Sequence, residues 1–322
     1  MRHLRRFYRI ALDAFYAFAA DDGWALASHI ALSALLALFP FLIVLTALAA
    51  FAGSKDIADN LATLLLDTWP REVAGPLSRE IHNVLTTTRG GVLTIGVVLA
   101  IYFSSSGVDS LRIALNRAYN VTETRPWWLL KLESIAYVLV AAFALLALGF
   151  LIVLAPLAFA TALKYLPWLA LQEQQFTYAR YAIAGTVIVI ALVVAHKWLP
   201  GGKRRFADIV PGIVVTLVLW LASGILFGRY LAEFANNYVT TYAGLASAMI
   251  ALVFLYWIAT IFVFGGALNA AILHERVLSR TPAARWGNPE DFAGIAVFLA
   301  SAASDFVTGT AIPIDGGFSV QG

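Results

Sequence analysis

The chain contains no cysteine and few charged residues. Of its 322 residues, 13% are Asp, Glu, Lys or Arg, whereas 61% are hydrophobic. The absence of Cys excludes disulfides, thiolate nucleophiles and Cys-based metal sites. A soluble domain has about 25% charged and about 45–50% apolar residues, so a soluble fold of this length could not bury so many apolar side chains. Together with a mean hydropathy of +0.81, this composition indicates a multipass membrane protein.

Six stretches are long and apolar enough to be expected as membrane-spanning helices, each of which needs about 20 predominantly apolar residues. They cover residues 24–52, 91–110, 134–162, 178–196, 209–229 and 243–273. Pro40 lies in the first stretch and predicts a kink or a split, because proline removes a backbone donor. The fold class expected is therefore an all-α polytopic membrane protein with short amphipathic helices outside the membrane.

The domain division follows from these stretches. Residues 1–23 are expected as a cytoplasmic interfacial segment, 24–278 as the six-helix membrane domain and 279–322 as a separate tail. Within the first segment, residues 4–19 place aromatic side chains on one helical face and arginines on the other, which is typical of a helix lying in the membrane interface.

The distribution of Lys and Arg predicts the orientation. Fifteen of the 22 Lys and Arg residues lie on one side of the predicted membrane: before the first span, after the last span, between the second and third spans, and between the fourth and fifth spans. The other seven lie on the opposite side. By the positive-inside rule the side with more Lys and Arg is cytoplasmic. We therefore expect both termini inside, in a bacterial inner membrane, and the loop 53–90 outside.

Polar residues within membrane-spanning segments are expensive and are the first candidates for function. The main cluster consists of Ser104, Ser105, Ser106, Asp109, Arg112 and Asn116. On a helix, Asp109, Arg112 and Asn116 share one face, which fits a polar path or a headgroup-binding strip. The alternative is a structural helix end, with an Asp109–Arg112 pair and serines bonding to their own backbone.

Further candidates lie in the first and last spans. Asn269 and His29 are polar residues that fit either transport or hydrogen bonding to a neighbouring helix. Small or special residues with an expected structural role are Pro40, Gly224, Gly228, Tyr242, Gly244, Gly265 and Gly266.

Motifs for cofactors and metals are missing from the sequence. There is no P-loop, no GxSxG and no HExxH, and the five histidines are scattered. We expect no cofactor, no metal and no ATPase activity of its own. The net charge of +3 does not favour nucleic acid, which leaves the lipid bilayer, a lipid or small-molecule substrate and a homo-oligomer as expected partners.

Several of these segments, in order, resemble the YihY/BrkB family of inner-membrane proteins, which has carried the label ribonuclease BN. The segments are LALFPFLIVLTALAAFAGS, IYFSSSGVDSLRIALNRAYNVTETRPWW and YVTTYAGLASAMIALVFLYWIATIFVFGGALNAAIL. The resemblance covers about residues 5–277 and implies six helices, cytoplasmic termini, and a role in envelope transport or lipid export. The family usually has Gly-Ala-Glu-Leu-Asn in the last helix, whereas Gly266-Ala267-Leu268-Asn269 lacks the acid.

The tail, residues 281–322, resembles the C-terminal end of short-chain dehydrogenases. The similar stretches are RWGNPED at 285–291, FLAS at 298–301, Thr308-Gly309 and Asp315-Gly316-Gly317. The resemblance implies a helix over about 289–303 and a strand over Thr310 to Ile314. The glycine-rich turn and the Tyr–Lys pair of that family are absent from the chain, so the tail predicts no oxidoreductase.

Two functions remain open from the sequence, with catalysis a less favoured third. The first is envelope transport or export of a lipid or solute; the second is a structural or assembly role without transport. A ribonuclease would need an acid and histidine cluster, which the sequence does not show.

Overall fold

A computed structural model describes residues 2–51, 90–149, 151, 155–242 and 246–320 of the chain. Every regular element in these ranges is a helix, and none of the described residues forms a strand. The helices are α1 (Arg2–Ala20), α2 (Gly23–Phe51), α5 (Gly90–Ala118), α6 (Trp127–Gly149), α7 (Ala155–Tyr165), α8 (Glu173–Trp198), α9 (Phe206–Tyr242), α10 (Ala246–Arg280) and α11 (Ala293–Leu299), with 3₁₀ turns at Pro167–Gln172, Pro289–Phe292, Ala302–Ser304 and Phe318–Val320. The all-helical class expected from the sequence is confirmed over this part of the chain.

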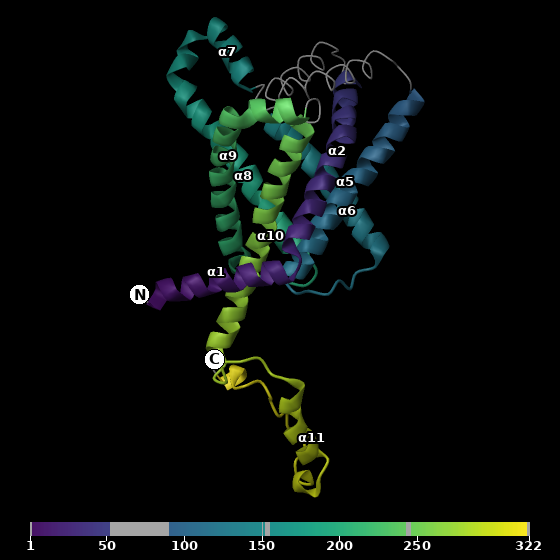
Figure 1. Cartoon of the computed structure of the whole chain (residues 1–322), viewed down its shortest axis with the longest axis vertical. Coiled ribbons are helices and arrows are strands. Elements are labelled where there is room, and N and C mark those ends of the chain that lie inside the picture. The colour runs from purple at the N-terminus through teal and green to yellow at the C-terminus, as the bar shows by residue number, and fades with distance from the viewer. Residues whose placement is uncertain (1, 52–89, 150, 152–154, 243–245, 321–322) are drawn as a thin grey trace.

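The long helices α2, α5, α6, α8, α9 and α10 form the body of the molecule (Figure 1). Four helical segments are long and apolar enough to cross a membrane: Trp127–Ala144, Trp168–Trp198, Phe206–Leu231 and Ala248–Arg280. They overlap the last four stretches expected from the sequence. The third stretch, expected as one helix over 134–162, takes in both α6, which ends at Gly149, and α7, which begins at Ala155. In the region of the first, only the shorter segment Gly23–Ala37 is apolar enough among the described residues.

The helix α2 remains helical through Pro40, so of the two predicted effects, a kink or a split, the split is wrong and the kink stays a prediction. A proline removes one backbone hydrogen bond, but in a membrane environment neighbouring turns keep a helix together around it. The helical conformation of this stretch therefore survives the loss of a single donor.

The packed core lies where α2, α5, α8, α9 and α10 meet, and it includes Phe18 of α1. Leu115, Ile209 and Thr216 are completely buried there. The helices α9 and α10 approach closely, because a Cβ atom on Gly212 would lie 2.1 Å from the carbonyl oxygen of Gly265. No residue with a side chain fits at this contact, so the two glycines allow the two backbones to touch.

The helix α1 crosses one end of this bundle, transverse to the long helices (Figure 1). We refer to this end as the α1 end. Asp21 and Asp22 form the turn into α2, and Asp22 has a left-handed φ of 57°. A Cβ on Gly23 would lie 2.3 Å from the Phe18 ring, so the turn requires glycine. Phe18 packs edge-on against Trp24 with 4.8 Å between ring centroids, which fixes the direction of α1.

The tail leaves the end of α10 and extends away from the bundle (Figure 1). The helix expected over about 289–303 is present as a 3₁₀ turn followed by α11. Thr310 to Ile314, expected as a strand, have no strand conformation. A strand needs a partner for its backbone groups, and no described residue pairs with this run. The end of the tail instead returns to the start of the tail, just past α10, where the N–H of Ala283 donates to the carbonyl of Gly316 at 3.0 Å.

Candidate functional site

Asp109 on α5 accepts hydrogen bonds from three side chains near the α1 end of the bundle. Arg112 Nη1 lies 3.1 Å from Oδ1, Ser134 Oγ lies 2.5 Å from the same oxygen, and Lys131 Nζ lies 3.0 Å from Oδ2. Ser134 and Lys131 belong to α6. The carboxylate therefore joins α5 to α6, with both of its oxygens hydrogen-bonded and 31% of the side chain exposed.

Arg112 is the most buried charged side chain of this cluster, with 4% of its side chain exposed. Its guanidinium lies between Asp109 and Glu133, whose Oε2 is 3.7 Å from Nη2. Nε and Nη2 have no hydrogen-bond partner among the described residues. A buried charge is costly unless it is paired, so the two carboxylates are required to keep Arg112 in place.

Arg125 continues the cluster into the loop between α5 and α6. Its guanidinium donates to Glu133 and Glu123, each at 2.8 Å, and to the carbonyl of Leu199 at 3.0 Å. Asn116 donates to Glu123 at 3.1 Å and accepts from the N–H of Gly201 at 2.8 Å. These bonds hold the α5–α6 loop against the loop between α8 and α9.

The hydrogen bonds from Arg125 lower the pKa of the Glu123 carboxyl to about 2, with a smaller contribution from Asn116. The same contact with Glu123 raises the pKa of Arg125. Both groups are therefore charged at neutral pH. The cluster contains three acids and three bases, listed as Asp109, Glu123, Glu133, Arg112, Arg125 and Lys131. The charges compensate one another, so the contacts favour the structural interpretation of Asp109, Arg112 and Asn116 over a free headgroup-binding strip.

Asn269 on α10 lies deeper, in a junction that the sequence did not reveal. Its Nδ2 donates to Tyr119 Oη and to the carbonyl of Ile209, both at 3.1 Å. Its Oδ1 accepts from the N–H of Gly212 at 2.6 Å. Asn269 is 1% exposed and both of its polar atoms are bonded, so the side chain links α10 to α9 and to the end of α5.

His196 completes this junction from α8. Its Nδ1 is hydrogen-bonded with Tyr119 Oη at 2.8 Å, and the residue is completely buried. Nε2 has no hydrogen-bond partner among the described residues. Burial raises the pKa of Tyr119 to about 12, so its phenol stays neutral. Sequence reasoning missed His196 and Tyr119 because they are 77 residues apart; the only available signal was a histidine at the end of an apolar stretch.

The serines of α5 bond mainly to their own helix. Ser105 donates to the carbonyl of Tyr102 at 2.8 Å, and Ser110 donates to that of Ser106, also at 2.8 Å. The hydroxyls of Ser110 and Ser33 lie 3.3 Å apart and connect α5 to α2. Ser104 and Ser106 are half-buried, whereas His29 on α2 is exposed and lies outside the polar junction.

The candidate glycines have different surroundings. A Cβ on Gly265 would lie 2.2 Å from Thr216 Oγ1, and one on Gly266 would lie 3.0 Å from Leu115. Gly224 and Gly228 have no atom within 4 Å of such a Cβ. They therefore face outward from α9 in the described part of the chain. Gly244 lies outside the described residues, and the side chains of Pro40 and Tyr242 do too.

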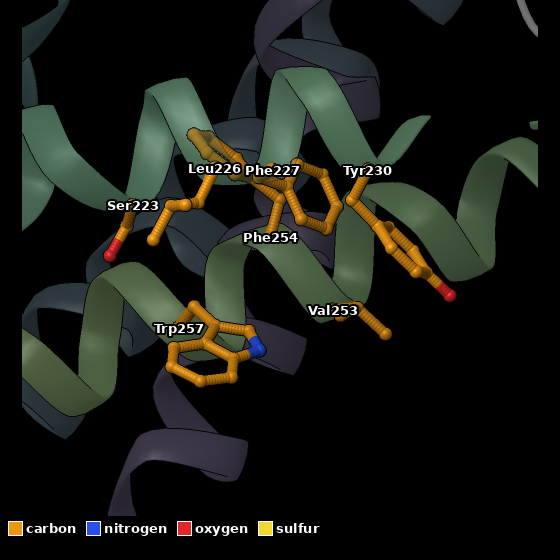
Figure 2. Close-up of a pocket in the computed structure, with 7 residues that line it drawn as sticks. All are labelled: Ser223, Leu226, Phe227, Tyr230, Val253, Phe254 and Trp257. Atoms are coloured by element: carbon orange, nitrogen blue, oxygen red, sulfur yellow. The ribbon is translucent and has the colours of Figure 1, made fainter. Parts of the chain in front are cut away.

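A groove of about 350 Å³ lies between α9 and α10 on the outer surface of the bundle. It is lined by Ser223, Leu226, Phe227, Tyr230, Val253, Phe254 and Trp257. Figure 2 shows the Phe227 and Phe254 rings at its centre, with Trp257 and Tyr230 toward opposite ends. The two Phe ring centroids are 5.3 Å apart. The volume is within the range of about 300–1,000 Å³ for ligand pockets, and the lining suits an apolar chain.

Comparisons with known proteins show relatives over most of the chain. The putative ribonuclease-like protein YfkH of Bacillus subtilis is 25% identical over 264 residues, which cover 82% of this chain and 94% of that protein. A UPF0761 membrane protein of Rhodospirillum centenum is 25% identical over 262 residues, which cover 78% of this chain and 54% of that protein.

A short segment is similar to enzymes of a different kind. Over 44 residues the chain is 58% identical to 2-dehydro-3-deoxy-D-gluconate 5-dehydrogenase of Formosa agariphila, which is 14% of this chain and 17% of that enzyme. No solved structure matches the chain.

The family model described as "Virulence factor BrkB" matches residues 14–288. These residues include α2 to α10, and therefore the Asp109 cluster, the junction of Tyr119, His196 and Asn269, and the groove. The chain is thus a membrane protein of the BrkB family.

Proposed function

We propose that this protein exports a lipid or another amphiphilic solute across a bacterial inner membrane, without ATPase activity of its own. The groove between α9 and α10 is the observation that carries the proposal. The groove lies within two segments that are apolar enough to span a membrane, Phe206–Leu231 and Ala248–Arg280. An occupant from the surrounding bilayer would reach it without passing through water.

The lining of the groove favours an amphiphile over a small polar solute. Leu226, Phe227 and Phe254 present apolar side chains to its centre, where an acyl chain gains from burial. Trp257 and Tyr230 combine an apolar ring with a polar tip, which suits the boundary between acyl chain and headgroup. The groove is therefore apolar at its centre and carries hydrogen-bonding groups at its two ends.

The proposal includes six membrane-spanning helices with both termini in the cytoplasm. The helices α2 and α5 contain 29 residues each, which corresponds to about 44 Å at 1.5 Å per residue, enough to cross a hydrocarbon core of about 30 Å. The chain has no native cysteine, so single cysteines report topology directly. Cysteine at Ser54 or Ser78 is expected to react with a membrane-impermeant reagent from the periplasm, and cysteine at Ser279 is not; the reverse pattern would contradict this orientation.

A second candidate function is structural or assembly work without transport. It is favoured by Asn269, whose polar atoms are all used to join helices, and by the compensated charges around Arg112. Ribonuclease activity receives less support, since the described residues contain no group of three or more His, Asp or Glu that could hold a metal ion.

Photo-crosslinking of a lipid into the groove tests the proposal. The probe is a phosphatidylglycerol with a photoreactive group in its acyl chain, incorporated into vesicles with the full chain. We expect cross-linked peptides from Ser223–Tyr230 and Val253–Trp257, and their loss in Ser223→Trp, whose indole would fill the groove. Leu221→Trp is the matched control, since Leu221 is 70% exposed and does not line the groove. Equal labelling of both variants would contradict a role for the groove.

A further inference from the structure

The helix α1 is rigidly held on one side and open on the other. Ala14 and Phe18 are buried against the bundle, and the Phe18 ring lies 6.3 Å from that of Phe264 on α10. Arg6 Nε lies 3.3 Å from Oε1 of Glu275, which is also on α10. These contacts, together with the glycine-dependent turn into α2, place α1 in a fixed position across the α1 end.

The open side of α1 carries aromatic residues. Tyr8 and Phe15 are 66% and 45% exposed, and they are seven residues apart, which places them on one helical face. This face is about a quarter-turn from that of Ala14, at 100° per residue. The Tyr8 and Phe15 side chains therefore point away from the core of the bundle, at the α1 end.

The next face of α1 is basic. Arg5 and Arg9 are exposed and one helical turn apart, and neither has an ion-pair partner among the described residues. The helix contains a single acid, Asp13, against four arginines. With its aromatic and arginine faces adjacent, α1 has the pattern of a helix that lies in a membrane interface.

From this arrangement we infer that α1 is a docking surface for anionic phospholipid headgroups of the cytoplasmic leaflet. Tyr8 and Phe15 enter the boundary between headgroups and acyl chains, and Arg5 and Arg9 contact the phosphates beside them. The bilayer is the occupant because α1 lies transverse to apolar helices (Figure 1) and continues directly into α2, whose first half is apolar. The positive charge selects anionic lipids over zwitterionic ones. This surface is separate from the groove and does not depend on its function, whereas its assignment to the cytoplasmic leaflet rests on the orientation proposed above.

A fluorophore on α1 measures the lipids around it. Leu12→Cys places a label three residues from Arg9, and the chain contains no other cysteine. The labelled full chain is reconstituted in phosphatidylcholine vesicles containing either spin-labelled phosphatidylglycerol or spin-labelled phosphatidylcholine as quencher. We expect stronger quenching by phosphatidylglycerol, because each arginine near the surface contributes about 1 kcal/mol, or about a fivefold enrichment.

Removing charge from α1 tests whether its arginines cause the stronger quenching by phosphatidylglycerol. Arg5→Gln with Arg9→Gln is expected to bring the quenching ratio of the two lipids close to one. Lys203→Gln with Arg205→Gln removes the same charge from exposed positions between α8 and α9 and is expected to leave the ratio unchanged. The inference would be overturned by a ratio near one in the labelled parent, by a label that neither lipid quenches, or by equal losses in the two double variants.

Discussion

Asn269 on α10 accepts a hydrogen bond from the backbone N–H of Gly212 on α9, at 2.6 Å. The bond forms at the point where Gly212 and Gly265 bring the two helix backbones into contact. A side-chain amide thus supplies a partner for the backbone of a neighbouring helix, which is how polar residues join helices in membranes. The same amide donates to Tyr119, the residue that follows α5, so Asn269 joins α10 both to α9 and to the end of α5.

Replacing Asn269 by Leu is expected to lower the free energy of unfolding by about 1–3 kcal/mol, because buried polar partners lose their hydrogen bonds. Thermal unfolding of the purified protein in detergent measures the change. Gln175→Leu, at an exposed position of α8, is the control and should change stability little. An Asn269 variant as stable as this control would show that the junction contributes nothing.

The Asp109 cluster predicts a dependence between two residues. Asp109→Asn leaves the buried Arg112 with only Glu133 opposite. Breaking a fully buried pair costs about 3–5 kcal/mol, and because 31% of the Asp109 side chain is exposed we expect a loss below that range. The double variant Asp109→Asn with Arg112→Gln restores charge balance, so it should be more stable than the single variant. Equal stability would mean that the two side chains do not interact.

An ion pair with a half-exposed arginine provides the comparison for this experiment. The Arg276 Nη1 and Asp208 Oδ1 atoms lie 2.5 Å apart, and 48% of the Arg276 side chain is exposed against 14% of the Asp208 side chain. The arginine that Asp208→Asn leaves behind is therefore in contact with solvent, unlike Arg112. Pairs of this kind contribute about 0–1 kcal/mol. Asp208→Asn should therefore have a much smaller effect than Asp109→Asn, measured by the same thermal unfolding.

The lowered pKa of Glu123 predicts a pH dependence. A carboxyl with a pKa near 2 in the folded protein and an ordinary value of 4.5 binds fewer protons when folded than when unfolded. Its contribution to stability is complete above about pH 4.5, declines as the pH falls below that value, and is lost once the pH passes about 2. The stability difference between the parent and Glu123→Gln should therefore shrink between pH 5 and pH 3, and a constant difference would contradict the Arg125 contact as its cause.

Sequence reasoning predicted the features that depend on local pattern. Long apolar runs predicted the helices α6, α8, α9 and α10, but not the separate helix α7, because the apolar run 134–162 continues into it. The placement of aromatic residues and arginines on two helical faces predicted the helix α1. The sequence could not show which polar residues meet, because Tyr119, His196 and Asn269 come from three separate segments. It also paired Asp109 with Arg112 alone, since Lys131 and Ser134 follow on the next helix.

Two expectations were misled by local or family pattern. Pro40 predicted a kink or a split, and the split is wrong because the loss of one hydrogen bond is local and the helix around it continues. Thr310 to Ile314 predicted a strand because the similar enzymes were taken to have one there. A strand depends on partners elsewhere in a sheet, and the described part of this chain provides none.

The tail is expected to be dispensable for the membrane domain. Its contacts are concentrated at the end of α10, where Trp286 Nε1 donates to His274 at 2.5 Å and the Arg280 guanidinium lies 5.1 Å from the Phe318 ring centroid. A stop codon after Arg280 should leave membrane insertion and the unfolding temperature unchanged, and the full chain should not bind NADH in a fluorescence titration. Collapse of the truncated protein, or measurable NADH binding, would show that the tail has a role in the fold or in a cofactor site.

Transbilayer movement of a fluorescent lipid tests the central claim most directly. Vesicles containing the full chain and a phosphatidylglycerol labelled on its acyl chain are exposed to dithionite, which reduces only the label in the outer leaflet. We predict that the parent protein and Leu221→Trp allow the inner-leaflet label to become reduced, whereas Ser223→Trp slows this phase toward the rate of protein-free vesicles. The account would be contradicted if the inner-leaflet label became reduced no faster in vesicles with the parent protein than in protein-free vesicles. It would also be contradicted if Ser223→Trp left the rate of this reduction unchanged.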